Sequence, residues 1–326
     1  MTDRETGDAS RPSATGLLFP GQGSQTVGMG RKLAEVFPRA RETFEEADEA
    51  LGLDLSRIAW EGPEEELVET RNAQPAILVH SVAAFRVLAD ELGPVAVAAG
   101  HSLGEFSAHV AAGTLTFADA LRAVRRRGEL MHEAGRARPG TMAAVLGLDD
   151  DQVAEACAAV DENGEGRCVP ANFNSPGQVV ISGDVPAVER AMEEVKERGA
   201  KRAIPLNVSG AFHSPLMEPA EEGLRAELQS LNFGDPRFPV VSNVTAEPVT
   251  RGVEARDLLV RQLTSPVRWT ASVSRMQEEG VDFFLELGPG SVLCGLNRRN
   301  ARGVDCVSVG EPGQVEAFRS ARGRER

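Results

Sequence analysis

One serine stands where a predicted strand meets a predicted helix, a setting that suits nucleophilic catalysis. Ser102 lies in GHSLG, which fits the pattern G-x-S-x-G, with the apolar run VAVAA before it and a helical pattern after it. In such a nucleophile elbow a tight turn exposes the hydroxyl, and Gly100 and Gly104 let strand and helix approach closely. The helix N-terminus would also direct backbone amides, first that of Leu103, toward an oxyanion. A helix-capping serine is the alternative interpretation.

A serine hydroxyl needs a base, and the chain has five histidines to supply one. His101 adjoins the serine and should point elsewhere on a tight turn, whereas His109 lies roughly 10 Å along the helix at 1.5 Å per residue. His80 and His132 fall in helical patterns, where a surface or core-edge position is expected. His213, in the predicted loop of NVSGAFHSPLM, is therefore the predicted base.

No acid between the serine and His213 stands out as the third member of a triad. Glu286, in LELGPG, could be proposed, but we favour a strand-end residue that positions the following turn. A backbone carbonyl can fix the tautomer of an imidazole, because the base needs an acceptor rather than a carboxylate as such. The sequence therefore predicts a Ser-His dyad.

The glycine-rich stretch FPGQGSQTVGMG follows the first predicted strand. It lacks the Gly-Lys-Ser/Thr ending of a Walker loop, and Thr26 stands where the dinucleotide-binding pattern requires glycine. Neither nucleotide site is expected. Such a turn can instead offer a backbone amide as a second oxyanion donor, as in elbow hydrolases.

A buried arginine is predicted in the helix TFADALRAVRRRGELMHEA. At 100° per residue, Ala120, Val124 and Met131 form its apolar stripe, and Arg127 falls on the same stripe. A buried guanidinium is costly unless an anion pairs with it, and its fork fits a carboxylate through two hydrogen bonds. Two partners are open: a structural Asp or Glu of the protein, and the carboxylate of a ligand. In the second case the substrate is an acyl group that carries its own acid.

Two kinds of pattern must position these residues. From residue 16, apolar strands alternate with helices, which indicates an α/β fold with a parallel sheet covered on both faces. Between residues 137 and 208 the order changes to strand, helix, strand, strand, helix, strand, the ferredoxin-like signature. After this small inserted domain, FPVVSNV, VDFFLELGPG and VDCVSV read as further strands of the first sheet. The α/β domain thus covers 16–136 and 209–326, and residues 1–15 are expected to form a disordered tail.

Composition excludes several classes of partner. The formal net charge of -14 over 326 residues argues against nonspecific binding to nucleic acid or anionic membranes. No stretch approaches the length of a membrane span. The four cysteines, Cys157, Cys168, Cys294 and Cys306, have no metal-binding or redox spacing, and a reducing cytoplasm is the expected location.

Motifs along nearly the whole chain after residue 15 resemble one family. They look like those of the malonyl-CoA:acyl carrier protein transacylase of fatty acid synthesis, in the same order: LLFPGQGSQTVGMG, GHSLGEFSAHVAAG, RRRGELMHEA, GAFHSPLM, VSNVTAEPV, LVRQLTSPVRWTASV and LELGPGSVLCGL. The resemblance implies an α/β hydrolase-like parallel-sheet domain with an inserted ferredoxin-like small domain. It also implies ping-pong transfer of malonyl from malonyl-CoA to acyl carrier protein, with no permanently bound cofactor.

By position, the resemblance assigns the reacting groups. Ser102 would be the nucleophile that takes malonyl from coenzyme A as an ester. His213 would be the base and later the acid. Arg127 would clamp the malonate carboxylate.

The resemblance also assigns the surroundings of the reacting groups. Gln22 and Leu103 would give the two oxyanion amides, and Gln262 would line the site with its carbonyl orienting the histidine. Phe212 resembles the bulky residue that disfavours a branched methylmalonyl group. The carrier protein of this family is acidic, so docking on so acidic a chain requires a local basic surface. The candidates for this basic docking surface are Arg122, Arg125, Arg126, Arg298 and Arg299. The protein itself is expected to be a monomer.

Three other functions remain open at this point. An acyltransferase that loads polyketide synthase carriers would use the same chemistry with a different partner. A serine hydrolase would release the acyl group to water, but it would not need a clamp for malonate at Arg127. A noncatalytic scaffold that binds carrier protein would make the serine, histidine and arginine set coincidental.

Overall fold

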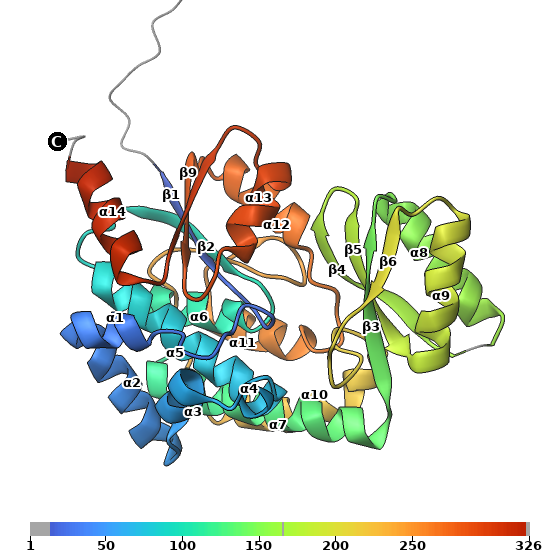
Figure 1. Ribbon diagram of the computed structural model, residues 1–326, viewed down its shortest axis with the longest axis horizontal. Coiled ribbons are helices and arrows are strands. Elements are labelled where there is room, and N and C mark those ends of the chain that lie inside the picture. The colour runs from blue at the N-terminus through green and yellow to red at the C-terminus, as the bar shows by residue number, and fades with distance from the viewer. Residues whose placement is uncertain (1–13, 165, 324–326) are drawn as a thin grey trace, which may run out of the picture.

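The computed structural model describes residues 14–164 and 166–323. The tail predicted over residues 1–15 lies outside the described residues except for its last two. Two sheets organise the chain, one of six strands and one of four. Figure 1 shows the larger sheet with most of the helices in one lobe and the four-stranded sheet with two helices in another.

The larger sheet has the strand order β10-β9-β1-β2-β7-β8. Neighbouring strands are parallel, except that β7 and β8 are antiparallel. Its strands are β1 (Thr15–Phe19), β2 (Val95–Gly100), β7 (Val240–Val241), β8 (Pro248–Val249), β9 (Phe283–Leu287) and β10 (Asp305–Val309). The predicted α/β fold with a parallel sheet is confirmed.

The first strand shows why its sequence is apolar at consecutive positions. Alternate side chains of a strand point to opposite faces of the sheet. Leu17 and Phe19 accordingly join the core on one face, whereas Leu18 joins the core on the other, and all three are fully buried. Helices cover both faces, so apolar side chains are required at consecutive positions from Leu17 to Phe19.

The larger lobe contains most of the helices. Helices α5 and α6 pack against β9, β1 and β2, while α12 and α13 pack against β2, β7, β9 and β10. Among the described residues, no helix is long and apolar enough to cross a membrane. The helices of this lobe are α1 (Arg31–Val36), α2 (Pro38–Leu51), α3 (Leu55–Glu61), α4 (Glu64–Leu67), α5 (Thr70–Leu88), α6 (Gly104–Ala112), α7 (Phe117–Ala137), α10 (Glu218–Gln229), α11 (Gly252–Arg261), α12 (Trp269–Glu278), α13 (Val292–Asn300) and α14 (Pro312–Gly323).

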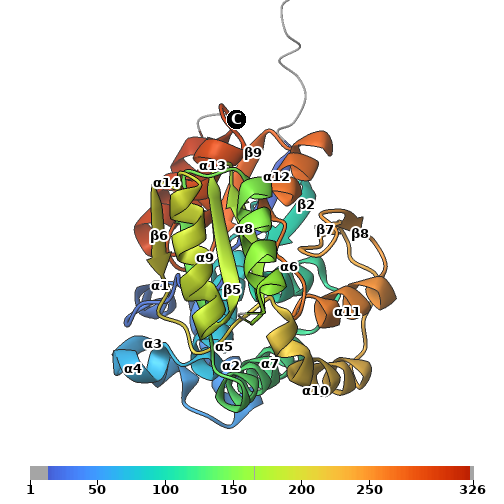
Figure 2. The ribbon, with the colours of Figure 1, turned by 90° about the vertical axis from the view of Figure 1, so that its right-hand side faces the viewer.

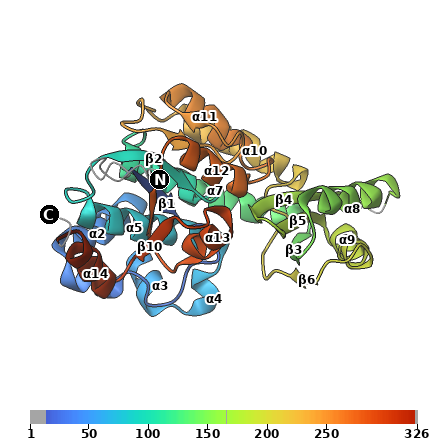
Figure 3. The same cartoon turned by 90° about the horizontal axis from the view of Figure 1, so that it is seen from above.

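The smaller lobe is an antiparallel sheet with the order β4-β5-β3-β6. Its elements follow the chain as β3 (Gly140–Leu146), α8 (Asp150–Glu162), β4 (Cys168–Ser175), β5 (Gln178–Asp184), α9 (Val185–Glu197) and β6 (Arg202–Pro205). Figure 2 shows α8 and α9 side by side in front of this sheet, and Figure 3 shows the lobe projecting from the rest of the molecule. The strand-helix order is the one that the sequence indicates for residues 137–208, and the boundaries of this domain stay a prediction.

One predicted strand is much shorter than expected. In FPVVSNV only Val240 and Val241 join the sheet, and the chain then leaves it. The backbone amide of Asn243 donates to a carboxylate of α6, and its side chain accepts a hydrogen bond from the backbone amide of Ser102. Residues that read as strand from their apolar pattern therefore support the serine turn instead.

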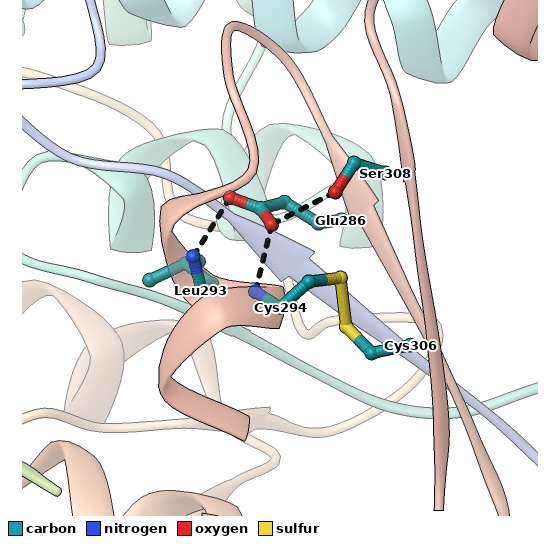
Figure 4. Close-up of a disulfide and its surroundings, with 5 residues drawn as sticks. All are labelled: Glu286, Leu293, Cys294, Cys306 and Ser308. Carbon is teal, nitrogen blue, oxygen red and sulfur yellow. Dashed lines mark hydrogen bonds between the residues drawn. A yellow bond between two sulfur atoms is a disulfide. The ribbon is translucent and has the colours of Figure 1, made fainter. Parts of the chain in front are cut away.

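The oxidation state of two cysteines differs from what a reducing compartment would give. Cys294, on α13, and Cys306, on β10, form a disulfide, whereas Cys157 and Cys168 are free and buried. Figure 4 shows the disulfide beside Glu286, whose carboxylate accepts hydrogen bonds from the backbone amides of Leu293 and Cys294. Glu286 thus fixes the start of α13 after the strand, as its position at a strand end predicts.

Reduction of the disulfide should lower stability. It closes a loop of sequence separation 12, and a cross-link of this size contributes about 3 kcal/mol to the free energy of unfolding. Urea unfolding with and without dithiothreitol measures the change. The double variant Cys294→Ser/Cys306→Ser should be weakened to the same extent and should not respond to the reductant. Identical unfolding curves for the oxidised and reduced protein would contradict this expectation.

Candidate active site

Ser102 lies in a strained turn between β2 and α6. Its φ is 52°, in the left-handed region that non-glycine residues rarely adopt. A Cβ on Gly100 would come within 1.9 Å of the backbone of Gly104, and a Cβ on Gly104 would come within 2.2 Å of the Phe19 carbonyl oxygen. Side chains at these positions would push the strand and the helix apart, so both glycines are required by close approach.

His213 is the histidine that reaches the serine. The Ser102 hydroxyl donates to His213 Nε2 over 2.7 Å, and His213 Nδ1 donates to the backbone carbonyl of Gln262 over 2.9 Å. The carbonyl acceptor fixes the tautomer that leaves Nε2 free to accept the serine proton. Like the serine, His213 has a positive φ, of 57°. The geometry is that of a Ser-His dyad with a carbonyl in place of the third carboxylate.

The environment keeps His213 neutral. Burial, reinforced by the positive charge of Arg127, lowers the pKa of His213 from 6.5 to about 3. Both causes disfavour the imidazolium, while the hydrogen bond to the Gln262 carbonyl favours it. At neutral pH the imidazole is therefore in the form that can accept a proton.

Arg127 lies inside the protein beside the dyad. The residue is 1% exposed, as its place on the apolar stripe of α7 predicts. Nη1 donates to Gln74 Oε1 over 2.7 Å, and Nη2 donates to Gln262 Oε1 over 2.9 Å and to Ser102 Oγ over 3.2 Å. The guanidinium therefore contacts the serine oxygen directly.

The partners of Arg127 bear on the two interpretations of its burial. Its hydrogen-bond acceptors are neutral oxygens, and its Nε has no partner among the described residues. Burial lowers the pKa of Arg127 to about 10, with Glu105 opposing the shift, so the group stays charged at neutral pH. The described residues thus provide the guanidinium next to Ser102 with no carboxylate hydrogen-bond partner, which favours a ligand as the source of one.

A cavity of about 460 Å³ opens onto the dyad. Gln22, from the glycine-rich turn, and Leu103, at the start of α6, both line it. The backbone amide of Ser102 is occupied, because it donates to Asn243 Oδ1 over 2.7 Å. Phe212 also lines the cavity, next to other apolar side chains from both lobes, namely Met131, Met142, Leu206 and Val208.

Among the described residues, no other histidine forms a hydrogen bond with the serine hydroxyl. His101 points to Asn174, and His109 contacts Thr114. The expectation of a surface or core-edge position is wrong for His80, which is 1% exposed and hydrogen-bonded to the Gly310 carbonyl. Helix α5 is enclosed by α2, α7 and β9, so a side chain outside its apolar stripe is buried too.

Three residues of the site escaped sequence reasoning. Gln74 holds Arg127 from α5, and Asn243 holds the backbone of Ser102. Glu105, three residues after the serine, accepts hydrogen bonds from Gln262 Nε2 and from the Asn243 backbone amide. The spacing of Glu105 from Ser102 was visible in the sequence, but its partners come from segments about 140 to 160 residues later.

The basic residues predicted for carrier docking fall into two groups. On α7, Arg122 pairs with Asp119, and the side chains of Arg125 and Arg126 both reach Glu129. These three are engaged with acids of their own helix. Two others are exposed and form no ion pair among the described residues, namely Arg298 and Arg299 on α13.

A strained serine lies at a strand-to-helix turn, with a neutral histidine and a buried cation against its hydroxyl, which is the arrangement expected of enzymes that act on acyl groups through a serine. The chain belongs to the acyl transferase domain family, which it matches over residues 17–322.

Its relatives narrow the family further. The chain is 50% identical to the malonyl CoA-acyl carrier protein transacylase of Escherichia coli over 92% of this chain and 97% of the relative. It is 48% identical to that of Bacillus subtilis over 93% and 96%. These matches confirm the resemblance that the motifs indicate.

Solved structures give the same result. An acyl carrier protein S-malonyltransferase from Vibrio cholerae matches with a TM-score of 0.90 and 47% identity, covering 94% of this chain and 100% of that one. A malonyl-transacylase in complex with a type II PKS acyl-carrier protein matches with a TM-score of 0.89 and 45% identity, covering 94% and 98%.

Proposed function

We propose that this enzyme transfers malonyl from malonyl-CoA to the phosphopantetheine thiol of acyl carrier protein through a malonyl ester of Ser102. The observation that carries the choice of acyl group is Arg127, a buried cation without a carboxylate partner among the described residues, 3.2 Å from Ser102 Oγ. An acyl group with its own carboxylate completes this pairing. The relatives are named for the same transfer.

In the first half-reaction Ser102 Oγ attacks the thioester carbonyl while His213 Nε2 takes the hydroxyl proton. The backbone amides of Leu103 and Gln22 hold the oxyanion, and each such donor contributes about a hundred- to a thousandfold. The carbon–sulfur bond then breaks, and the coenzyme A thiolate leaves with the proton from His213. The malonyl carboxylate lies against Arg127 throughout.

The second half-reaction runs the same steps in reverse. His213 takes the proton of the carrier thiol, and the sulfur attacks the ester carbonyl of malonyl-Ser102. Ser102 Oγ leaves and recovers the proton from His213, because one group acts as base and then as acid. No other reactant is needed. Malonyl-CoA enters as a substrate, and we propose that the enzyme holds no cofactor permanently. We also propose the monomeric state and the cytoplasmic location that the sequence predicts, and in such a reducing compartment Cys294 and Cys306 would be kept as thiols.

Acyl carrier protein is the proposed macromolecular partner. Arg298 and Arg299 on α13 are the part of the predicted basic surface that is free to meet an acidic partner, since the arginines of α7 are already paired. A carrier of fatty acid synthesis is the first choice. The relative solved with a type II PKS acyl-carrier protein makes a polyketide carrier the second. Transfer rates to purified carriers of both kinds separate the two.

The choice of malonyl is tested by Arg127→Ala. A buried carboxylate left without its partner costs about 3–5 kcal/mol, so acylation by malonyl-CoA should fall by about two to four orders of magnitude in kcat/KM. Acylation by acetyl-CoA should not fall, because acetyl has no carboxylate to pair. Release of coenzyme A measures both rates.

Arg136→Ala is the matched control for this experiment, because Arg136 is an exposed arginine of the same helix. It should leave both rates unchanged. Equal malonyl rates in Arg127→Ala and the parent would show that Arg127 is structural, and the choice of malonyl would then lose its support.

A further inference from the structure

One buried carboxylate lies beside the dyad and has no part in the proposed chemistry. Glu105 is on the first turn of α6, and it is 1% exposed. Burial raises its pKa to about 7, while hydrogen bonds and the charge of Arg127 oppose the shift. Burying a carboxylate costs free energy unless its oxygens accept hydrogen bonds, so the partners of Glu105 matter.

The acid contacts two residues that in turn touch the reacting groups. Glu105 Oε2 accepts a hydrogen bond from Gln262 Nε2 over 2.6 Å and another from the Asn243 backbone amide over 3.1 Å. Gln262 and Asn243 are both fully buried. They come from different segments, the end of α11 and the loop after β7. Glu105 is thus a common acceptor for two arms of the site.

The first arm leads to the cation. A primary amide can point its oxygen or its nitrogen in a given direction, and only its nitrogen donates. Gln262 Nε2 donates to Glu105 and also to the Ser102 carbonyl over 3.0 Å, which leaves Oε1 to accept from Arg127 Nη2. The opposite orientation would set an N–H group against the guanidinium and an oxygen against the carboxylate. Glu105 therefore fixes the orientation in which Gln262 holds Arg127.

The second arm leads to the serine turn. The backbone of Asn243 is held by Glu105, and its side chain accepts from the Ser102 amide over 2.7 Å and donates to the Gly100 carbonyl over 2.8 Å. Ser102 has a strained backbone with φ of 52°. Such a conformation persists only where the surroundings hold it. Asn243 holds both sides of the bend.

We propose that Glu105 is a positioning residue of the acyl transfer, which fixes Arg127 through Gln262 and the turn at Ser102 through Asn243. The inference rests on the proposed function for its choice of malonyl. The two arms should affect the acylation rates of different substrates. The Gln262 arm matters most for an acyl group that carries a carboxylate, whereas the Asn243 arm matters for every acyl group.

The test compares acylation by malonyl-CoA and by acetyl-CoA in Glu105→Ala and Glu105→Gln. Leaving buried donors without a partner costs roughly 1–3 kcal/mol. Glu105→Ala should therefore lose about 10- to 100-fold in kcat/KM for malonyl-CoA, and several-fold less for acetyl-CoA. Glu105→Gln keeps an oxygen that can accept both hydrogen bonds, so it should recover most of the loss. If the role of Glu105 were merely structural, kcat/KM would fall alike for malonyl-CoA and acetyl-CoA.

Glu286→Ala is the matched control, because Glu286 is also a buried acid that accepts backbone amides, but at the start of α13. It should lower stability and leave the ratio of malonyl to acetyl rates unchanged. If Glu105→Ala does not fold, Gln262→Met breaks the first arm from its other end and should lower the same ratio by about tenfold. The double variant Glu105→Gln/Gln262→Met should show no further loss in that ratio beyond Gln262→Met.

The outcomes separate this inference from the proposed function. A parent enzyme that is not acylated by malonyl-CoA would overturn the proposed function. A parent that is acylated, with Arg127→Ala losing its malonyl preference while Glu105→Ala and Gln262→Met keep theirs, would overturn the role of Glu105 alone. Equal losses for both substrates in these two variants would also overturn it.

Discussion

Replacing Ser102 with alanine should abolish malonyl transfer. Every step of the proposed reaction passes through the ester on Ser102 Oγ, and removing the nucleophile of a serine enzyme lowers kcat by about a millionfold. The remaining groups, His213 and Arg127, then have no oxygen between them to acylate. Release of coenzyme A from malonyl-CoA in the presence of acyl carrier protein measures the rate.

Ser107→Ala is a matched control for this substitution. Ser107 lies on α6, the helix that follows Ser102, is fully buried, and has a hydroxyl without a hydrogen-bond partner among the described residues. The control should retain the parent rate. Transfer by Ser102→Ala above about one per cent of the parent rate would mean that another group carries the acyl chain, and the mechanism would have to be abandoned.

Replacing His213 with alanine should lower the rate of acylation by about a hundred- to ten-thousandfold, the usual contribution of a general base. Nε2 is the hydrogen-bond acceptor for the serine hydroxyl, at 2.7 Å. His132→Ala serves as the control, because His132 is half-buried on α7 and outside the cavity. A loss of less than about tenfold would place the base elsewhere.

The pH dependence of the Glu105→Gln variant tests the same residue without the Glu105 carboxylate, whose pKa burial raises to about 7. A base works in its unprotonated form, so activity is lost as the pH falls through its pKa. Burial lowers the pKa of His213 to about 3, and kcat/KM of this variant for malonyl-CoA should therefore stay level as the pH is lowered from 8 to about 5. A decline centred near the ordinary histidine pKa of 6.5 would contradict the buried, neutral imidazole.

Much of the site follows from local rules that a sequence carries. The turn at Ser102 was predictable because glycines on both sides are needed where the strand and the helix touch. Burial of Arg127 follows from its place on the apolar stripe of α7. His213 was predictable by eliminating the other histidines. A backbone carbonyl as its partner was predictable because a neutral imidazole that acts as a base needs an acceptor for its other ring N–H group.

Other parts depend on contacts between distant segments. Glu105 looks like any polar residue of a first helical turn, and only the fold brings Gln262 and Asn243 to it. Gln74 is unremarkable in α5 until α7 packs against that helix. The disulfide between Cys294 and Cys306 depends on the contact of α13 with β10 rather than on a cysteine motif.

The fold likewise has parts that the local sequence predicts and parts that depend on distant contacts. Strand β1 is recognisable because both of its faces are buried, and the order of elements in the smaller lobe is visible in the sequence. The length of β7 is not, since the residues after Val241 leave the sheet to hold the serine turn. Ion pairing on α7 was also missed, because a run of arginines in a sequence gives no sign of which acids will contact it.

The intact mass of the enzyme after incubation with malonyl-CoA alone is the decisive observation. We predict that one malonyl group is added, that peptide mapping places it on Ser102, and that adding acyl carrier protein returns the enzyme to its original mass while the carrier gains the malonyl group. An unchanged mass, a malonyl group on a different residue, or a malonyl-enzyme that does not discharge to the carrier would contradict the transfer proposed here.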